Sequence, residues 1–429
     1  PCVVGWPRPS EPTRLLESAR GPALLLLAAA ALAIPFTALG SVVCAVLERS
    51  QERLGAVYGA TFAGGAIGAL LALCGMEYLG APRTVGLLAL LPLLAARGAS
   101  AAGPALAGLV FGGALLVAPD TLLPLHSRKH FPVIQPSQVL AEEWNAFSRV
   151  TFYANPERHG LWEMAPDYNG SLPQSIGIAI DAWAITSILR RSDVESDPRF
   201  LDAYPPTLAY ANAPAGFDAL VIGAGGGVDV LGALHFGAGH VTAVEINPLI
   251  VTAVQDRFGE FAGDLYRDPR VTAVAAEGRA FIDHDDRLYD RIVLSGVDTF
   301  AATEAGAFAL SENFLYTVEA LQSYYRHLKP GGILAMTRWW FDPPRQTLRL
   351  ALTANAALLD LGCADPGAQM FIAVTRRTST NSLFLLKKGD FEPGEVDALV
   401  AACQRRGSDL VYAPGRAPHP IYAAALAVG

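Results

Sequence analysis

The segment from residue 217 to residue 248, FDALVIGAGGGVDVLGALHFGAGHVTAVEINP, decides the fold. Residues 217–222 form an apolar run typical of a buried strand, and residues 223–227 form a glycine-rich turn. A short helical pattern over 228–235 and a second apolar run over 241–246 follow. This order predicts a strand–turn–helix–strand unit whose glycines let backbone N–H groups approach a ligand at the helix N-terminus.

An acidic residue at the end of the second strand narrows the ligand to a nucleoside. Glu245 lies 22 residues after Gly223, where a carboxylate can accept hydrogen bonds from ribose hydroxyls. The fingerprint of dinucleotide-binding proteins requires a glycine at the sixth position of the loop, and Val228 stands there. A nicotinamide-dependent enzyme is therefore the less favoured interpretation.

The same alternation continues along the chain. Residues 271–275, 289–294 and 333–337 are further predicted strands, and LKPGG at 328–332 precedes the last of them. Glu277 follows the third strand, in a position suited to an adenine amino group, and Ser295 follows the fourth. This order resembles the class I methyltransferase fold, an α/β Rossmann-like fold that binds S-adenosylmethionine.

Five pieces of sequence carry a closer resemblance. They are VIGAGGGVDVL (221–231), VTAVEINP (241–248), AEGRAFI (276–282), LSGVDTFAATEAGAFALSENFLYTVEAL (294–321) and HLKPGGILAMTRW (327–339). Together they resemble the spermidine synthase family, the polyamine aminopropyltransferases, and in particular its membrane-anchored bacterial branch. The resemblance covers about residues 140–390 and implies a transferase that uses decarboxylated or ordinary S-adenosylmethionine as substrate, with an amine such as a polyamine as acceptor.

The resemblance also implies a set of site residues. The cofactor-binding set comprises the loop, the end of the second strand, the adenine position and the end of the fourth strand: Gly223, Gly225, Gly226, Gly227, Asp229, Glu245, Ile246, Asn247, Glu277, Gly278 and Ser295. The predicted catalytic residues are Asp298, Ser295 and Glu304, and the predicted acceptor pocket contains Glu312 and Tyr316.

Two departures from the family pattern remove carboxylates from a site built for cations. The family has an aspartate inside the loop that meets the amine of decarboxylated S-adenosylmethionine, and Gly226 stands there. It has a second aspartate after the fourth strand that deprotonates the attacking amine, and Ser295 stands there. An amine with a pKa near 10 needs a base within hydrogen-bond reach. Asp229 is the candidate replacement for the loop acid, and Asp298 or Glu304 for the base.

These departures leave three classes of function open. The first is a membrane-tethered aminopropyltransferase. The second is a methyltransferase, since a loop without an aspartate repels the carboxylate of ordinary S-adenosylmethionine less. The third is a non-catalytic nucleotide-binding or transport-coupled membrane protein.

The first third of the chain has a different composition. Residues 21–127 contain only four arginines and four acidic residues, and residues 21–47 and 54–76 contain no charge at all. Each run exceeds the ~20 residues that span a bilayer as a helix. With the apolar stretches 84–96 and 98–119, we predict three or four membrane helices. The pairs Gly55/Gly59, Gly64/Gly68 and Gly108/Gly112 are spaced as in closely packed membrane helices.

The predicted organisation follows from these patterns. It comprises an N-terminal flank (1–20), a transmembrane region (21–119), a linker (120–136), a small β-rich subdomain (137–212), a Rossmann-like transferase domain (213–390) and a C-terminal helix with a tail (391–429). The chain begins with Pro1 rather than Met, so we expect a fragment or a processed form.

The net charge and the spacing of cysteines and histidines indicate which kinds of partner and metal site to expect. The net charge of −8 argues against a nucleic-acid-binding protein. The five cysteines form no C-x-x-C pair and the histidines no H-E-x-x-H motif, so no metal site is expected. We expect the lipid bilayer and a small amine as partners, with a homodimer possible in principle. S-adenosyl compounds are made in the cytoplasm, so the expected location is the inner membrane, multi-pass, with the soluble part facing the cytoplasm.

Overall fold

A computed structural model describes most of the chain. The described residues are 26, 33, 37, 40–49, 51–90, 102–118, 134–156, 168–181, 184–297, 314–341, 343–376, 380–416 and 419–426. The chain divides into two compact units. Unit 1 comprises the described residues of Pro1–His130 together with Glu143–Arg149. Unit 2 comprises the described residues of Phe131–Glu142 and Val150–Gly429.

Unit 1 is helical. Its elements are η1 (Gln51–Arg53), α3 (Leu54–Leu79), α4 (Ala81–Leu90) and α5 (Ala102–Val117), and residues 40–49 are also helical. Helix α3 ends at Gly80, which adopts a φ of 76° that favours glycine. Within the described ranges, α3 is the one helix that is long and apolar enough to cross a membrane, and its apolar stretch is not buried by the rest of the chain.

Small residues account for the packing between helices of unit 1. A Cβ on Gly112 would lie 2.7 Å from the carbonyl oxygen of Gly86, so α4 and α5 approach through these two glycines. By contrast, a Cβ on Gly55, Gly59, Gly64 or Gly68 would meet no atom of the described residues within 4 Å. The predicted glycine contact is thus seen at Gly112, while the glycine pairs of α3 have no described neighbour.

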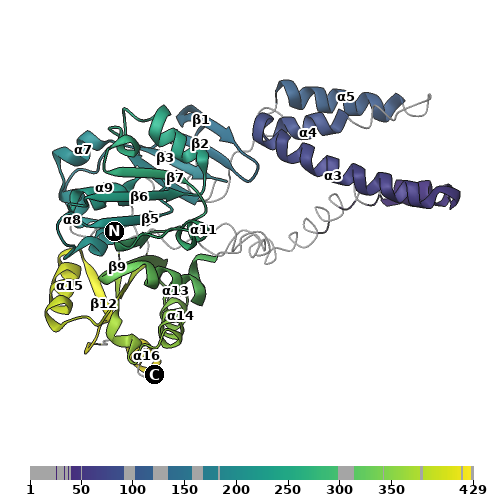
Figure 1. The fold of residues 1–429 in the computed structure, drawn as a ribbon. Helices are drawn as coiled ribbons and strands as arrows, with labels where there is room; N and C mark the ends of the chain where they lie inside the picture. Colours follow the sequence, from purple (N-terminus) through teal and green to yellow (C-terminus); the bar gives the residue numbers. More distant parts are fainter. Residues whose placement is uncertain are drawn as a thin grey trace. The chain divides into compact units, whose positions relative to one another are not determined.

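Unit 2 contains the Rossmann-like part (Figure 1). Its sheet has eight strands in the order β12-β10-β11-β9-β8-β5-β6-β7. The strands are β5 (Asp218–Ile222), β6 (His240–Glu245), β7 (Val271–Ala275), β8 (Tyr289–Leu294), β9 (Leu328–Trp339), β10 (Met370–Arg376), β11 (Thr380–Lys387) and β12 (Ser408–Tyr412). Strands β5 to β9 pair in parallel, and β10 to β12 are antiparallel to their neighbours.

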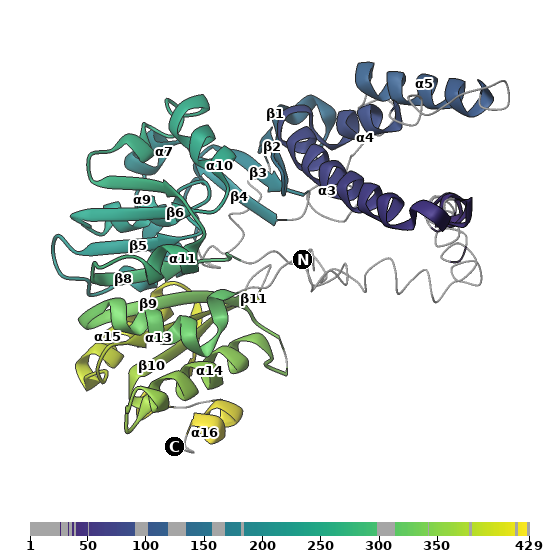
Figure 2. The ribbon, with the colours of Figure 1, turned by 45° about the vertical axis from the view of Figure 1, so that its right-hand side comes forward.

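Helices cover both faces of this sheet (Figure 2). Side chains of β5 alternate between two cores: Ala219 and Val221 belong to one, Leu220 and Ile222 to the other. The first core is completed from α9 (Val228–His235), α10 (Pro248–Thr252), η5 (Pro205–Tyr210) and α15 (Pro393–Arg405). The second is completed from α11 (Gly278–Asp283), α13 (Val318–His327), α14 (Gln346–Asp360) and α16 (Pro420–Leu426). Burial on both faces explains why these strands are continuously apolar.

A smaller antiparallel sheet precedes the large one, in the order β1-β2-β3-β4. Its strands are β1 (Val139–Trp144), β2 (Arg149–Ala154), β3 (Ser175–Ile180) and β4 (Ala184–Leu189), and α7 (Arg191–Ser196) and α8 (Arg199–Ala203) follow it. The predicted class I methyltransferase-type α/β fold with a small preceding β-sheet is therefore confirmed.

Three local features add detail to the predicted organisation. The four strands of the small sheet all lie within the predicted β-rich subdomain (137–212). The sheet continues past residue 390, because β12 pairs with β10. Helix α13 begins at Val318, because the Thr317 hydroxyl accepts from the N–H of Ala320 and caps the helix there.

Candidate functional site

The glycine-rich loop joins the carboxyl end of β5 to α9. Strand β5 pairs with β6 on one side and β8 on the other, so the direction of the strand order reverses at β5. In open α/β sheets, ligands bind beyond the carboxyl ends of the strands at such a switch point. Gly223, Gly225 and Gly227 adopt φ values of 74°, 51° and 89°, which L-residues rarely adopt. The N–H groups of Gly223 and Ala224 donate to the carbonyl oxygen of Val244, which ties the loop to β6.

Close contacts also require glycine at the two ends of the loop. A Cβ on Gly223 would lie 2.1 Å from a methyl carbon of Val297, in the segment that follows β8. A Cβ on Gly227 would lie 2.5 Å from a methyl carbon of Leu265. The loop is thus held between the ends of neighbouring elements, and its glycines serve packing as well as conformation.

Gly226, where the family has the loop aspartate, has no room for a side chain. A Cβ there would lie 2.0 Å from the backbone oxygen of Ser187 in β4. The hydroxyl of Thr186 in β4 lies 3.5 Å from the Gly226 N–H. Strand β4 therefore occupies the space that a loop carboxylate would need.

Glu245 lies at the end of β6 and turns back toward the loop. Its Oε2 accepts from the N–H of Gly225 at 2.9 Å, and its Oε1 accepts from the N–H of Asn247 at 2.9 Å. The side chain is 6% exposed, and this burial raises the pKa of its carboxyl group, opposed by the backbone N–H groups. Each oxygen keeps a lone pair for a further donor such as a ribose hydroxyl.

The two residues after Glu245 differ in role. Ile246 is 57% exposed, although its side chain is large and apolar. It offers an apolar surface beside the acid. Asn247 is buried and caps α10, because its side chain accepts from the N–H of Leu249. The structure therefore assigns Asn247 to the helix cap.

Glu277 and Gly278 form the start of α11. The Glu277 carboxylate accepts from the N–H groups of Arg279 and Ala280 and so caps this helix. It remains exposed to solvent. A Cβ on Gly278 would lie 2.3 Å from a methyl carbon of Ile222 at the end of β5. Gly278 thus lets α11 approach β5, which brings Glu277 near the glycine-rich loop.

Asp229 and Ser295 are brought together by the fold. Asp229 lies in the first turn of α9 and is 8% exposed, and Ser295 follows β8. The Ser295 hydroxyl lies close enough to the Asp229 carboxylate to act on its pKa, while Oδ1 of Asp229 has no hydrogen-bond partner within the described residues. Burial raises the pKa of Asp229 to about 6, and the nearby Ser295 hydroxyl acts in the opposite direction. A buried carboxylate oxygen without a donor is costly unless a ligand supplies one.

Neighbouring contacts hold this pair in place. The N–H of Gly296 donates to the Thr337 hydroxyl of β9 at 2.8 Å, which fixes the backbone after Ser295. The Tyr210 hydroxyl donates to the carbonyl oxygen of Asp229 at 2.9 Å. Tyr266 donates from its hydroxyl to the carbonyl oxygen of Gly225, and its pKa lies well above the ordinary value because the ring is buried and Glu245 and Asp229 are near.

The predicted acceptor pocket is described only in part. Tyr316 belongs to η8 (Phe314–Tyr316), and the Arg338 guanidinium carbon lies 4.0 Å from the centre of its ring. The predictions for Asp298, Glu304 and Glu312 lie outside the described residues. In the part of the chain that the structure describes, no group of three His, Cys, Asp or Glu side chains lies close enough to hold a metal ion.

The sequence did not point to three of the residues that shape the site. They are Thr186 and Ser187 of β4 and Tyr266 of η7 (Leu265–Arg267). Each reaches the loop from a distant part of the chain. A weak signal existed for β4, whose residues 184–189 are rich in β-branched side chains.

Comparisons with known proteins support the resemblance. No family model matches the chain. Polyamine aminopropyltransferase 2 of Pseudomonas aeruginosa is 28% identical over 120 residues, which are 28% of this chain and 32% of that protein. The polyamine aminopropyltransferase of Streptococcus pneumoniae is 34% identical over 116 residues, which are 27% of this chain and 37% of that protein.

A solved structure gives a weaker likeness. Spermidine synthase from Thermotoga maritima covers 69% of this chain and 86% of its own, with a TM-score of 0.41 and 17% identity. The chain spans about a third of the length of the curated relatives it matches. The predicted resemblance to the spermidine synthase-like family is confirmed over this matched part, and those relatives are transferases by name.

Proposed function

We propose that the Rossmann-like part of this chain binds decarboxylated S-adenosylmethionine and transfers its aminopropyl group to a small amine, such as a polyamine. The observation that carries this proposal is the buried Asp229 carboxylate, which has an unpartnered oxygen beside the glycine-rich loop. The similarity to polyamine aminopropyltransferases supports the same reaction class.

The residues at the carboxyl ends of the strands fit this substrate. The glycine-rich loop offers a close approach to the backbone, and Glu245 keeps acceptor capacity for the ribose. The exposed Ile246 side chain would lie against the adenine ring, and the Glu277 carboxylate would face the adenine amino group. Asn247 would affect substrate binding only indirectly, because its side chain caps the start of α10.

Asp229 distinguishes decarboxylated from ordinary S-adenosylmethionine. The decarboxylated compound ends in an ammonium group, which would pair with the Asp229 carboxylate in a buried, charge-assisted hydrogen bond. The ordinary compound carries a carboxylate as well, which the Asp229 charge would repel. Gly226 cannot take over this task, because β4 leaves it no room for a side chain. In this chain, Asp229 in the first turn of α9 would take the role that the loop aspartate has in the family.

The reaction itself needs positioning and one base. The neutral acceptor nitrogen attacks the aminopropyl carbon next to the sulfonium, so a C–N bond forms while the C–S bond breaks. The electron pair of the broken bond goes to sulfur, and the nitrogen loses a proton to a base. Asp298 remains the proposed base, with Glu304 as the alternative, and Ser295 is proposed to hold Asp229 in place.

Binding to the full chain, purified in detergent, tests the proposal. Calorimetry should show tighter binding of the decarboxylated compound than of S-adenosylmethionine. Asp229→Asn should weaken binding of the decarboxylated compound about 10- to 100-fold, because a hydrogen bond to a charged group is lost. Asp360→Asn removes an exposed acid from the end of α14 and should change nothing.

The other outcomes separate the remaining classes. Preference for S-adenosylmethionine, with no effect of Asp229→Asn, would contradict the proposal and favour methyl transfer. Tight binding without release of methylthioadenosine from any tested amine would favour a non-catalytic nucleotide-binding protein.

We also propose that unit 1 anchors the chain in the inner membrane, with unit 2 on the cytoplasmic side. Helix α3 presents large apolar side chains to its surroundings, among them Phe62, Ile67 and Leu70. The chain should then sediment with membranes, resist extraction by alkaline carbonate and dissolve in detergent. Release by carbonate alone would contradict the anchor. The possible homodimer stays a prediction.

A further inference from the structure

A cavity of about 690 Å³ lies at the far end of α9 from the glycine-rich loop. Phe236, which follows the last residue of α9, lines the cavity, whereas the loop precedes the first. Since α9 has eight residues, these ends are about 12 Å apart. The volume of the cavity is in the range of pockets that bind small organic ligands.

One cavity wall carries a buried arginine. Arg406 follows α15 and is 7% exposed. Its Nε has no hydrogen-bond partner within the described residues, and its Nη1 makes one long bond, 3.3 Å, to the carbonyl oxygen of Ala402. Burial lowers the pKa of Arg406. A buried guanidinium with an unused donor is costly unless an acceptor enters the cavity.

The charges around the cavity leave an excess of positive charge. Three arginines line it: Arg199, Arg405 and Arg406. Arg199 is paired with Asp197 through two hydrogen bonds, at 2.7 and 2.8 Å. Asp202 is the one acid among the described residues that line the cavity. It lies 3.3 Å from His235, and its charge also acts on Arg406. Three arginines against two aspartates leave one positive charge.

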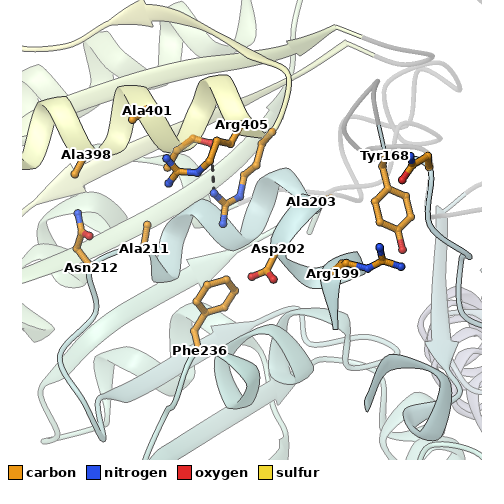
Figure 3. Close-up of a pocket in the computed structure, with 13 residues that line it drawn as sticks. Tyr168, Arg199, Asp202, Ala203, Ala211, Asn212, Phe236, Ala398, Ala401 and Arg405 are labelled. Carbon is orange, nitrogen blue, oxygen red and sulfur yellow. Dashed lines mark hydrogen bonds between the residues drawn. The ribbon is translucent and has the colours of Figure 1, made fainter. Parts of the chain in front are cut away.

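Apolar groups complete the cavity. Figure 3 shows Ala398, Ala401 and Arg405 on the helix along one side, with Asp202 and Phe236 facing them. The Phe236 ring stacks on Tyr210 behind it, which holds the ring in place. A ligand here would meet guanidinium donors on one side and an aromatic ring on the other.

We propose that this cavity is a second ligand site, for a small organic anion whose phosphate or carboxylate oxygens bind Arg406 and Arg405. Its apolar part would lie against Phe236. The cavity has an excess of positive charge, whereas the proposed transferase site has acidic side chains that would bind a cation. The proposal does not depend on aminopropyl transfer, because no residue of the cavity belongs to the glycine-rich loop or its partners.

Anion titration of the full chain in detergent tests this site. The unfolding temperature and calorimetric heat are measured with inorganic phosphate, AMP and citrate at constant ionic strength. At least one should bind, and Arg406→Gln should weaken that binding at least about tenfold, because charge-assisted hydrogen bonds are lost. Arg349→Gln removes an exposed arginine from α14 outside the cavity and should leave binding unchanged.

A second variant keeps the test decisive if Arg406→Gln fails to fold. Asp202→Asn removes the acid that lines the cavity in the described part of the chain and should tighten anion binding several-fold. Binding of phosphate and AMP would identify the ligand as a phosphate compound. Binding of citrate alone would identify it as a carboxylate compound. No binding by any of the three anions, or equal binding by wild type, Arg406→Gln and Asp202→Asn, would overturn the proposal. Loss of S-adenosyl binding would leave this result unaffected.

Discussion

The two ends of α9 have opposite chemistry. At its start, the carboxylates of Asp229 and Glu245 lie beside a glycine-rich loop. At its end, Arg405 and Arg406 line a cavity next to Phe236. Acids near a helix start and cations near a helix end both agree with the helix dipole. Near each end there is also a buried polar atom without a hydrogen-bond partner among the described residues, Oδ1 of Asp229 at the start and Nε of Arg406 at the end. One short helix thus separates the proposed cation site from the proposed anion site.

The largest expected effect is at Gly226. In Gly226→Ala the new Cβ would clash with the backbone oxygen of Ser187, so β4 or the loop must move. Overpacking of this kind costs up to about 3 kcal/mol, or more where backbone must shift. We expect a clear fall in the unfolding temperature, together with loss of S-adenosyl binding. Gly394→Ala in α15 has open space around its Cβ and should be neutral or stabilising. Equal behaviour of the two variants would show that β4 does not close the loop.

The next effect concerns pH and Asp229. Burial raises the pKa of Asp229 from 3.8 to about 6 in the folded chain, a difference of roughly 3 kcal/mol. The folded state then binds the proton more tightly than the unfolded state, so its stability falls as pH rises from about 4 to 6. Asp229→Asn should remove this fall and be more stable than wild type at pH 7, while binding the decarboxylated substrate less well.

Unfolding temperatures of both proteins between pH 4 and pH 7 provide the measurement. Asp268 is the matched comparison, because hydrogen bonds from Arg270 and Arg191 lower the pKa of its carboxyl group. The stability that Asp268 contributes to the folded state is present above the unfolded pKa and is lost as pH falls. Asp268→Asn should therefore lower the stability of the folded chain at pH 7 and have a smaller effect at low pH. A parallel pH dependence of both variants would contradict the assigned burial of Asp229.

Glu245 should affect both S-adenosyl compounds alike. Glu245→Gln replaces one acceptor oxygen by a donor, which would face the N–H of Gly225 or Asn247. We expect binding of both compounds to weaken about 10- to 100-fold, because an acceptor for the ribose hydroxyls is lost. Calorimetry with each compound is the measurement. A selective loss for one compound would mean that Glu245 senses the methionine-derived arm rather than the ribose.

The smallest effect is expected at the far end of α9. Phe236→Ala removes the aromatic wall of the cavity and should weaken anion binding a few-fold while leaving S-adenosyl binding unchanged. The same calorimetric titrations measure both. If S-adenosyl binding changed as much as anion binding, the two ends of α9 would have to be treated as one coupled site.

Local sequence was informative wherever neighbours along the chain decide the structure. The apolar runs and the glycine-rich turn predicted β5, α9 and β6 within a residue or so. The placement of Glu245 followed from its position at a strand end. Gly226 and Ser295 were recognised as departures from the family pattern by position alone. The small sheet was predicted only as a β-rich subdomain, without the bounds of its strands, because β1 and β4 have little alternation to mark them.

By itself, the sequence determined the α/β class, the glycine-rich loop after β5, the acid at the end of β6 and the apolar character of the first third. Tertiary structure alone decided that β4 fills the space at Gly226, that Asp229 meets Ser295, and that Arg406 is buried at a cavity. The physical reason is that the first group depends on hydrogen bonding and burial within short segments. The second depends on which distant segments pack together, and no local pattern encodes that.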